Sequence, residues 1–458
     1  MIRQNRHNPG LERQSRTGSK LPATLVIQSL RGRDQYAKMP LVRKSPVRNT
    51  LLKSIALAAF ALPVGLAMSA DFSTQPLMDL RIEQNDNINL DPGGSPDGDV
   101  LGYIADMELL FGIRTPRGNT SLRPRLKVQE YPDRDDFERI ESFFDMQSRY
   151  EWQRSNFDFG GYYSRQDTYN SDTPGGDFDP LDPDGGGDPD SGALVIGETR
   201  TRVELRPTFE HRVTERTSIG ISADYQTARY DADDGATDKT DYDFGVARGY
   251  LSWALDPASD FSVGGYASRY ETQDDSEESD AVGGQLGYLY RWSERDGIEA
   301  SLFYESNDTT QFAPVVAEET TSNWGGEFTV YRKLEVSEWR FTIGRAFIPT
   351  GDNGKSESDH FRLQYDRQLS QKLALKGVAR YDSRSALGTL GGGTDRDYAR
   401  ADLSLKWFFS PTWYVGGGYS FIWEDREQAV DDAHNNKLFI NFGYQGRGRQ
   451  NPGSISGP

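Results

Sequence analysis

A two-residue alternation of apolar and polar side chains recurs along most of this chain, and it constrains the fold more than any other feature. One segment carries Tyr103, Ala105, Met107, Leu109, Phe111 and Ile113 at every second position, and another carries Trp413, Val415, Gly417, Tyr419, Phe421 and Trp423. Because successive side chains of a β-strand point to opposite faces, this period predicts strands with one apolar and one polar face.

Eighteen segments of this kind follow one another. We expect strands at residues 77–87, 100–114, 120–130, 138–152, 156–168, 199–212, 218–230, 242–255, 260–271, 281–292, 297–307, 322–334, 338–348, 358–369, 372–384, 396–409, 412–424 and 436–444. An even number of antiparallel strands of about ten residues or more is typical of a bacterial transmembrane β-barrel. The fold class predicted is therefore all-β, a transmembrane antiparallel barrel over residues 71–444.

The predicted connections alternate in length. Short ones, such as 115–119 and 256–259, alternate with longer acidic ones, such as 169–198 and 272–280. Short periplasmic turns and long external loops are the pattern of outer-membrane barrels, whereas a soluble sandwich or propeller gives no reason for such alternation. We therefore expect both termini on the periplasmic side.

The eight tryptophans support the same interpretation. Six fall near the turn ends of predicted strands and two near the loop ends: Trp152, Trp253, Trp292, Trp339, Trp407 and Trp413, then Trp324 and Trp423. Indole has an apolar body and a polar edge, so tryptophan gathers at membrane interfaces. The alternative is a set of core tryptophans in a soluble protein.

The first 70 residues have the features of an export leader. A basic stretch precedes the apolar run SIALAAFALPVGL at 54–66, and small residues follow it, so cleavage is expected after Ala67, Ser69 or Ala70. Translation could begin at Met39 instead. The leader carries a net charge of +10, so the rest carries −28 against −18 for the whole chain. An acidic body without clustered positive charge argues against a nucleic-acid partner.

Composition and motifs give little support to an enzyme. The chain has no Cys and only four His, at positions 7, 211, 360 and 434, and no phosphate-binding glycine motif. No cofactor is expected. The acidic loop 169–198 carries Asp179, Asp182, Asp184 and Asp188, which are candidate oxygen ligands for Ca²⁺, but the spacing of a twelve-residue calcium loop is absent. A solvated acidic loop is the alternative.

The two faces of the predicted strands carry different charges. Four arginines take the lipid-facing parity near the loop ends, namely Arg165, Arg229, Arg269 and Arg345. We expect them to reach the phosphates of lipopolysaccharide, with simple snorkelling as the alternative. The inward parity holds a row of bases in each of several strands: Arg123, Arg125 and Lys127, then Arg200, Arg202 and Arg206, and further along Arg380 and Arg400. They are candidates for a selective field in a hydrated lumen, or for wall cations paired with Glu141, Asp145 and Glu204.

The segment RIEQNDNINL at 81–90, with its exit Asp86-Asn87-Ile88, resembles the first strand of putative β-barrel porin families, several of which are associated with exopolysaccharide export. The strand count also resembles that of alginate-export porins, whose channel is electropositive. Barrels of this kind typically end in an aromatic residue that serves as an assembly signal. In this sequence the tail QGRGRQNPGSISGP at 445–458 instead follows Tyr444.

These features together predict an outer-membrane porin of a Gram-negative bacterium, inserted by the barrel assembly machinery among outer-membrane lipids. The resemblance implies passage of hydrophilic solutes, among them an anionic polysaccharide or oligosaccharide. The loop 169–198 is expected to fold in and narrow the mouth. A non-conducting structural or adhesion barrel remains the alternative, and a membrane hydrolase a more distant one.

Overall fold

The computed structural model describes most of the body of the chain. The described residues are 70–94, 99–132, 134, 138–168, 198–232, 239–312, 316–352, 354–388, 395–427 and 431–446. The chain divides into two units, 1–64 and 65–458, of which the first lies outside the described residues. The predicted leader up to Ser69, the greater part of the acidic loop 169–198 and the tail beyond Gly446 also lie outside them.

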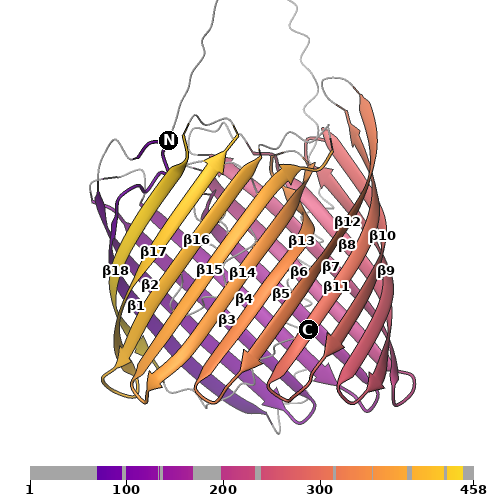
Figure 1. Ribbon diagram of the computed structural model, residues 1–458, viewed down its shortest axis with the longest axis horizontal. Coiled ribbons are helices and arrows are strands. Elements are labelled where there is room, and N and C mark those ends of the chain that lie inside the picture. Colours follow the sequence, from indigo (N-terminus) through magenta and orange to yellow (C-terminus); the bar gives the residue numbers. More distant parts are fainter. Residues whose placement is uncertain are drawn as a thin grey trace, which may run out of the picture. The chain divides into compact units, whose positions relative to one another are not determined.

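The described residues form eighteen β-strands (Figure 1). They are β1 (Asp71–Asn85), β2 (Val100–Thr115), β3 (Gly118–Glu130), β4 (Arg139–Glu151), β5 (Ser155–Asp167), β6 (Glu198–Arg212), β7 (Thr217–Ala232), β8 (Tyr242–Asp256), β9 (Ser259–Thr272), β10 (Glu277–Tyr290), β11 (Asp296–Gln311), β12 (Ala317–Lys333), β13 (Ser337–Thr350), β14 (Gly354–Ser370), β15 (Leu373–Ala386), β16 (Arg396–Phe408), β17 (Trp413–Arg426) and β18 (Ala433–Gln445). Within the described ranges, no helix is long and apolar enough to cross a membrane.

The strands close into a single antiparallel barrel. Each strand pairs with the next along the chain, and β1 pairs with β18 from Leu77 opposite Gln445 to Asn85 opposite Lys437. Closure matters because an open sheet leaves a row of unpaired backbone groups at each edge. The predicted fold class and the number of strands are confirmed.

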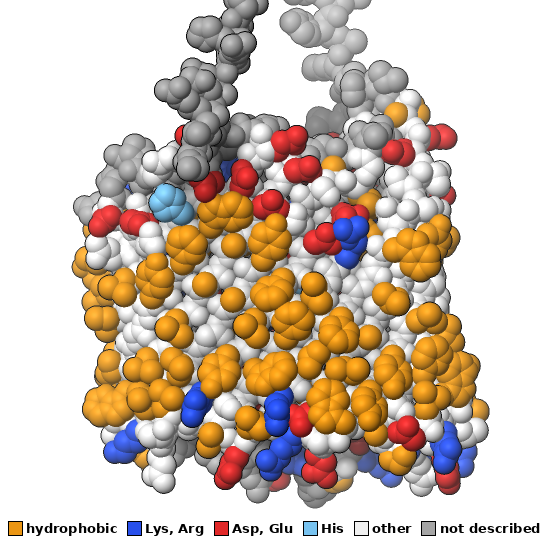
Figure 2. Space-filling view, in the orientation of Figure 1, with side chains coloured by type: hydrophobic (Ala, Val, Ile, Leu, Met, Phe, Trp, Pro, Cys, Tyr) orange, Lys and Arg blue, Asp and Glu red, His pale blue; other side chains and the backbone are white. Residues whose placement is uncertain are grey.

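Burial alternates along the strands in the way the sequence period predicts. Along β2 the side chains of Val100, Ile104 and Asp106 are buried, whereas those of Leu101 and Tyr103 are exposed. The outward side chains form a broad hydrophobic band, with acidic residues gathered above it and most of the visible Lys and Arg below it (Figure 2). The inward side chains are largely polar or charged.

Aromatic side chains gather at the strand ends. Trp152 follows the last residue of β4 and contacts Tyr150 edge-on, and Trp413 begins β17 and stacks on Phe442 with ring centroids 5.1 Å apart. Trp152 and Trp413 match the sequence prediction that tryptophan lies near strand ends. Trp324, 68% exposed, instead lies midway along β12, because that strand begins at Ala317 rather than at 322.

Several strands extend further toward the long-connection rim than predicted. β10 begins at Glu277 rather than at 281, β11 ends at Gln311 rather than at 307, and β12 begins at Ala317 rather than at 322. The predicted loops 272–280, 308–321 and 349–357 are therefore largely strand. The alternation of apolar residues stops where the outer surface becomes polar, but backbone pairing continues beyond that point. A prediction from hydrophobicity alone therefore makes these strands too short.

Candidate functional site

The inner wall of β2–β4 carries the first predicted basic row. Arg123 Nε lies 2.7 Å from Glu108 Oε1, Arg125 Nε lies 2.9 Å from Asp106 Oδ1, and Lys127 Nζ lies 3.4 Å from Glu141 Oε2. The three cations face inward, as their parity predicts. Each meets a carboxylate on a neighbouring strand, so this row is balanced in charge.

The second predicted row lies on β6. Arg200 and Arg202 are buried, and Arg202 forms an ion pair with Glu204 and donates to Gln226 Oε1 at 3.1 Å. Arg206 also pairs with Glu204, but its side chain is 55% exposed to the lumen. Of the three arginines, Arg206 is therefore the one most accessible to a solute.

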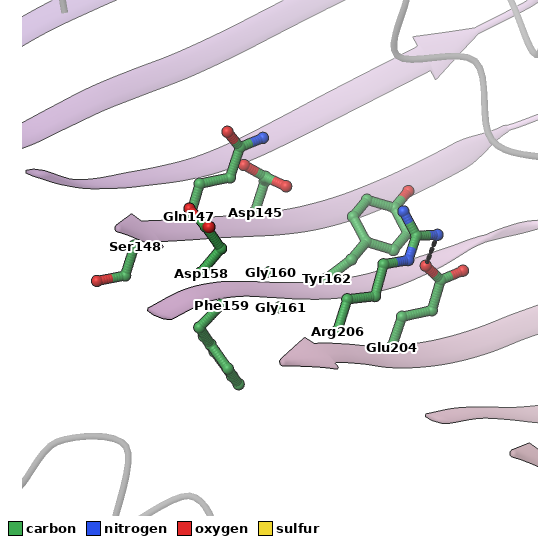
Figure 3. A pocket seen from close by; sticks show the side chains of 10 residues that line it. All are labelled: Asp145, Gln147, Ser148, Asp158, Phe159, Gly160, Gly161, Tyr162, Glu204 and Arg206. Atoms are coloured by element: carbon green, nitrogen blue, oxygen red, sulfur yellow. Dashed lines mark hydrogen bonds and ion pairs between the residues drawn. The ribbon is translucent and has the colours of Figure 1, made fainter. Parts of the chain in front are cut away.

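A pocket of about 260 Å³ opens on the lumen wall beside Arg206 (Figure 3). In Figure 3, Asp145 and Gln147 of β4 lie on one side and Arg206 and Glu204 of β6 on the other. Gly160 of β5 is the register partner of Gln147 and of Arg206, and its missing side chain leaves the hollow between them. The lining residues are Asp145, Gln147, Ser148, Asp158, Phe159, Gly160, Gly161, Tyr162, Glu204 and Arg206.

Across β14–β17 the strand register places arginines side by side in two ladders. The lower ladder is Arg362 opposite Arg380 and Arg380 opposite Arg400; the upper is Arg384 opposite Arg396 and Arg396 opposite Arg426. Directly opposed like charges repel, so such rows are unfavourable for folding unless carboxylates offset them.

Two carboxylates offset part of this charge. Asp402 Oδ2 lies 2.8 Å from Arg400 Nε, and Glu424 lies within 2.7 Å of both Arg396 and Arg426. The sequence predicted Arg380 and Arg400 as lumen residues, but it did not predict the ladders. Three consecutive strands with arginine at the inward parity were the available signal, and only the register places those arginines at one level.

Among the described residues, two connections fold inward at the mouth; the loop 169–198, which is expected to do so, lies outside the described ranges but for Glu198. The first is the exit of β1. Leu90 is 1% exposed and packs on Tyr398, Ile422 and Ala433, which line the inner face of β16–β18. Its φ of 52° is unfavourable for a branched side chain, and this burial offsets the strain.

The Asp86-Asn87-Ile88 motif holds this exit in place. Asp86 accepts from the backbone N–H and the side-chain amide of Asn436, at 2.6 and 2.7 Å. Asn87 accepts from the N–H of Asp91 at 3.0 Å and donates to the carbonyl of His434 at 3.0 Å. The motif therefore ties β1 to β18 where the barrel closes.

The second inward connection is the tip of the β13–β14 hairpin. Tyr270 Oη of β9 donates to the Thr350 carbonyl at 2.9 Å and accepts from the Gly354 N–H at 3.2 Å. Lys239 Nζ lies 2.7 Å from Asp352 Oδ1. The predicted strands 338–348 and 358–369 leave residues 349–357 as an external loop. The structure instead lays this tip on the inner wall of β7–β10, where buried tyrosines receive it.

Three of the four outward arginines are paired with carboxylates of their own barrel. Arg229 lies 2.7 Å from Asp243, Arg269 lies 2.7 Å from Glu278, and Arg345 lies 2.6 Å from Asp359. Arg165 is exposed, and no carboxylate of a described residue forms an ion pair with it. The predicted contact with lipopolysaccharide phosphates stays a prediction, and Arg165 is the strongest candidate for it.

The structure brings one serine and one histidine together. Ser155 Oγ and His211 Nδ1 lie 2.9 Å apart on the outward face of β5 and β6. A hydrolytic triad also needs an acid or amide that orients the imidazole, and none among the described residues bonds to His211.

The described ranges contain no group of three or more His, Asp or Glu residues placed to hold a metal ion. The calcium candidates Asp179, Asp182, Asp184 and Asp188 lie outside those ranges.

The sequence matches no family model and no curated protein. Solved structures with a similar arrangement include OccAB3 of Acinetobacter baumannii, at 10% identity and a TM-score of 0.42, covering 82% of this chain and 99% of that one. OpdK of Pseudomonas aeruginosa, solved with vanillate, has 13% identity and a TM-score of 0.42, and the match covers 82% of this chain and 99% of that one. The ferric-catecholate import receptor Fiu of E. coli has 8% identity to this chain and a TM-score of 0.39, and the match covers 81% of each chain. Likeness of this degree transfers neither substrate nor activity, and the fold rests on the strand pairing itself.

Proposed function

We propose that this protein is a channel of the Gram-negative outer membrane, through which hydrophilic solutes diffuse. One observation carries the proposal: the barrel has an apolar outside and a charged inside. Outward side chains in mid-strand are exposed and hydrophobic, such as Val282 at 64%, Leu302 at 61% and Ile440 at 66%. In water such a surface would aggregate, whereas in a bilayer it is stable.

A barrel of this size is wide enough for an aqueous passage. Eighteen strands enclose more space than inward side chains can fill, as in other barrels with sixteen to eighteen strands. The exposed side chain of Arg206 and the pocket beside it lie on the wall of that space. The inward tips at Leu90 and Thr350–Gly354 narrow it at the mouth.

The charges of the wall support a preference for anions. Bases and acids largely balance on β2–β6, whereas the ladders on β14–β17 place six arginines on one side of the lumen. A ring or row of one sign favours solutes of the opposite sign. We propose an anionic oligosaccharide or polysaccharide as the solute class, and export of such a polymer as the process.

Ion currents across a planar bilayer test the proposal. Purified protein that is folded in detergent should give discrete conductance steps, with chloride more permeant than potassium. Folded protein that inserts without any conductance would contradict the channel. It would favour the alternative of a structural or adhesion barrel, for which the acidic upper rim in Figure 2 is the supporting observation.

A further inference from the structure

The pocket beside Arg206 forms a hollow in the inner wall of β4–β6. Gln147 of β4 and Arg206 of β6 are both register partners of Gly160 on β5, so their backbones lie two strand spacings, about 10 Å, apart. Gly160 presents no side chain between them, and the space that it leaves belongs to the pocket of about 260 Å³. The β4–β6 hollow therefore depends on one glycine between two long polar side chains.

The side chains around the hollow divide between the two faces of the sheet. In Figure 3, Gln147, Tyr162 and Arg206 extend to one side of the strands, whereas Ser148 and Phe159 extend to the other. This division follows the alternation of a strand, in which neighbouring residues face opposite ways. The lumen side of the hollow is therefore polar, and it is lined by Asp145, Gln147, Asp158, Gly160, Tyr162, Glu204 and Arg206.

The charges around the hollow are balanced within the wall. Glu204 forms an ion pair with Arg206, and Asp158 Oδ1 lies 3.3 Å from Arg149 Nε. Asp145 lies opposite an arginine of β3 in the register. A ligand with a net charge would have to compete with these pairs, whereas an uncharged ligand leaves them intact. The hollow therefore suits an uncharged ligand.

The polar groups of the hollow retain hydrogen-bonding capacity beyond these pairs. Arg206 donates through Nη2 to Glu204, but its guanidinium carries five N–H groups and its side chain is 55% exposed. Gln147 is exposed, and its amide both donates and accepts. The carboxylates of Asp145 and Asp158 only accept. A hydroxyl group donates and accepts at one atom, so a ligand with several hydroxyls matches this mixture of groups.

The size and the lining of the hollow suit a single ring. Its volume of about 260 Å³ is below the range of about 300–1,000 Å³ that is usual for sites of drug-sized ligands. Tyr162 adds an aromatic ring to the lining, with an apolar face and a polar hydroxyl. A pyranose ring likewise combines an apolar C–H face with hydroxyls around its edge. Size, balanced charge and mixed hydrogen-bonding groups therefore all favour a neutral sugar ring.

We propose that the β4–β6 hollow is a binding subsite for one uncharged pyranose ring of a saccharide in the lumen. The subsite deepens the proposed function and rests on it. It takes a neutral sugar unit, whereas the arginine ladders on β14–β17 favour acidic groups. Because the hollow is open to the lumen, a bound ring can leave it again, as passage through a channel requires.

Filling the floor of the hollow tests the subsite. A Cβ at Gly160 would meet Arg206 Cβ at 3.5 Å, an ordinary contact, so Gly160→Val adds bulk beside Gln147 without a backbone clash. Ser404→Val, at an inward position of β16, is the matched control. Gln147→Met keeps the size of the side chain but removes its amide. Gln285→Met, which changes an inward glutamine of β10, is the control for that variant.

Saturation-transfer NMR measures the binding in protein folded in lauryldimethylamine oxide, a detergent without a sugar headgroup. The probes are the methyl glycosides of glucose, galactose and mannose, and at least one should give a saturable signal with the wild type. Gly160→Val should abolish that signal. Gln147→Met should raise the dissociation constant about threefold to tenfold, which corresponds to one hydrogen bond. Both controls should bind as the wild type does, and methyl glucuronoside, which adds a carboxylate, should bind more weakly than methyl glucoside.

The outcomes separate the subsite from the channel. The subsite is overturned if none of the three neutral glycosides binds to folded wild-type protein, if Gly160→Val and Gln147→Met bind as the wild type does, or if methyl glucuronoside binds more tightly than methyl glucoside. If Gly160→Val does not fold, Gln147→Met at its exposed position decides. The conductance measured in planar bilayers involves no sugar, so it tests the channel independently. Glycoside binding without any conductance would contradict the channel and support the subsite.

Discussion

Arg380 and Arg400 lie directly opposite each other on the inner face of β15 and β16, and Arg362 lies opposite Arg380 on the other side. Arg380 is therefore the centre of a row of three like charges. No single strand shows this arrangement, because each contributes one arginine. The relationship makes Arg380 the residue whose charge should most affect the ions that pass.

Reversing the charge of Arg380 should change ion selectivity. Arg380→Glu replaces the centre of the ladder with a carboxylate, so the permeability ratio of chloride to potassium should fall, as read from reversal potentials in a salt gradient. Arg345→Gln, on the outward face, is the control and should leave the ratio unchanged. An unchanged ratio in Arg380→Glu would show that the ladder does not face the ion path.

Loss of one hydroxyl should loosen the hairpin tip. Tyr270→Phe removes the bonds to Thr350 and Gly354, both buried, and we expect a loss of about 1–3 kcal/mol in the free energy of unfolding. Open-channel conductance should rise because the tip leaves the lumen. Urea unfolding in micelles and single-channel currents measure the two effects. Tyr288→Phe, at an outward position, should change neither.

A charge on the outer face should destabilise the barrel far more than the same charge on the inner face. Leu286 faces outward beside its register partners Leu302 and Val263. Leu286→Arg should therefore lower the free energy of unfolding, measured in lipid vesicles, by about 2–4 kcal/mol. Its neighbour Gln285 faces the lumen, so Gln285→Arg should lower the free energy of unfolding much less. Equal costs for the two variants would contradict the assignment of the faces.

Removing the Asp86 carboxylate should weaken closure between β1 and β18. Asp86→Ala deprives the Asn436 N–H and side-chain amide of their acceptors, at an expected cost of about 1–3 kcal/mol. The temperature at which the folded band disappears on a gel in dodecyl sulfate should fall. Asp99→Ala, which removes one exposed hydrogen bond from Gln84, is the control. A fall as large in the control would contradict a special role for Asp86.

Much of the architecture could be predicted because the residues of each barrel strand alternate between an apolar outward face and a polar inward face. Leu126 lies between Arg125 and Lys127, for example, and this local alternation sufficed to count eighteen strands and to assign Arg123 and Arg202 to the inner wall. Most of the tryptophans could be placed for the same reason, since they lie near the ends of their strands as Trp152 and Trp413 do, whereas Trp324 lies midway along β12. A period of two depends only on the geometry of an extended chain.

The register and the inward hairpin were decided by the tertiary structure alone. Arg380 and Arg400 are twenty residues apart in sequence, and the sequence of neither strand indicates that they are register partners. The β13–β14 hairpin alternates like any other, yet Tyr270, Lys239 and Glu277 from other parts of the chain hold its tip against the inner wall. Each of these choices depends on contacts between segments that are remote along the chain, and only the closed barrel brings those segments together.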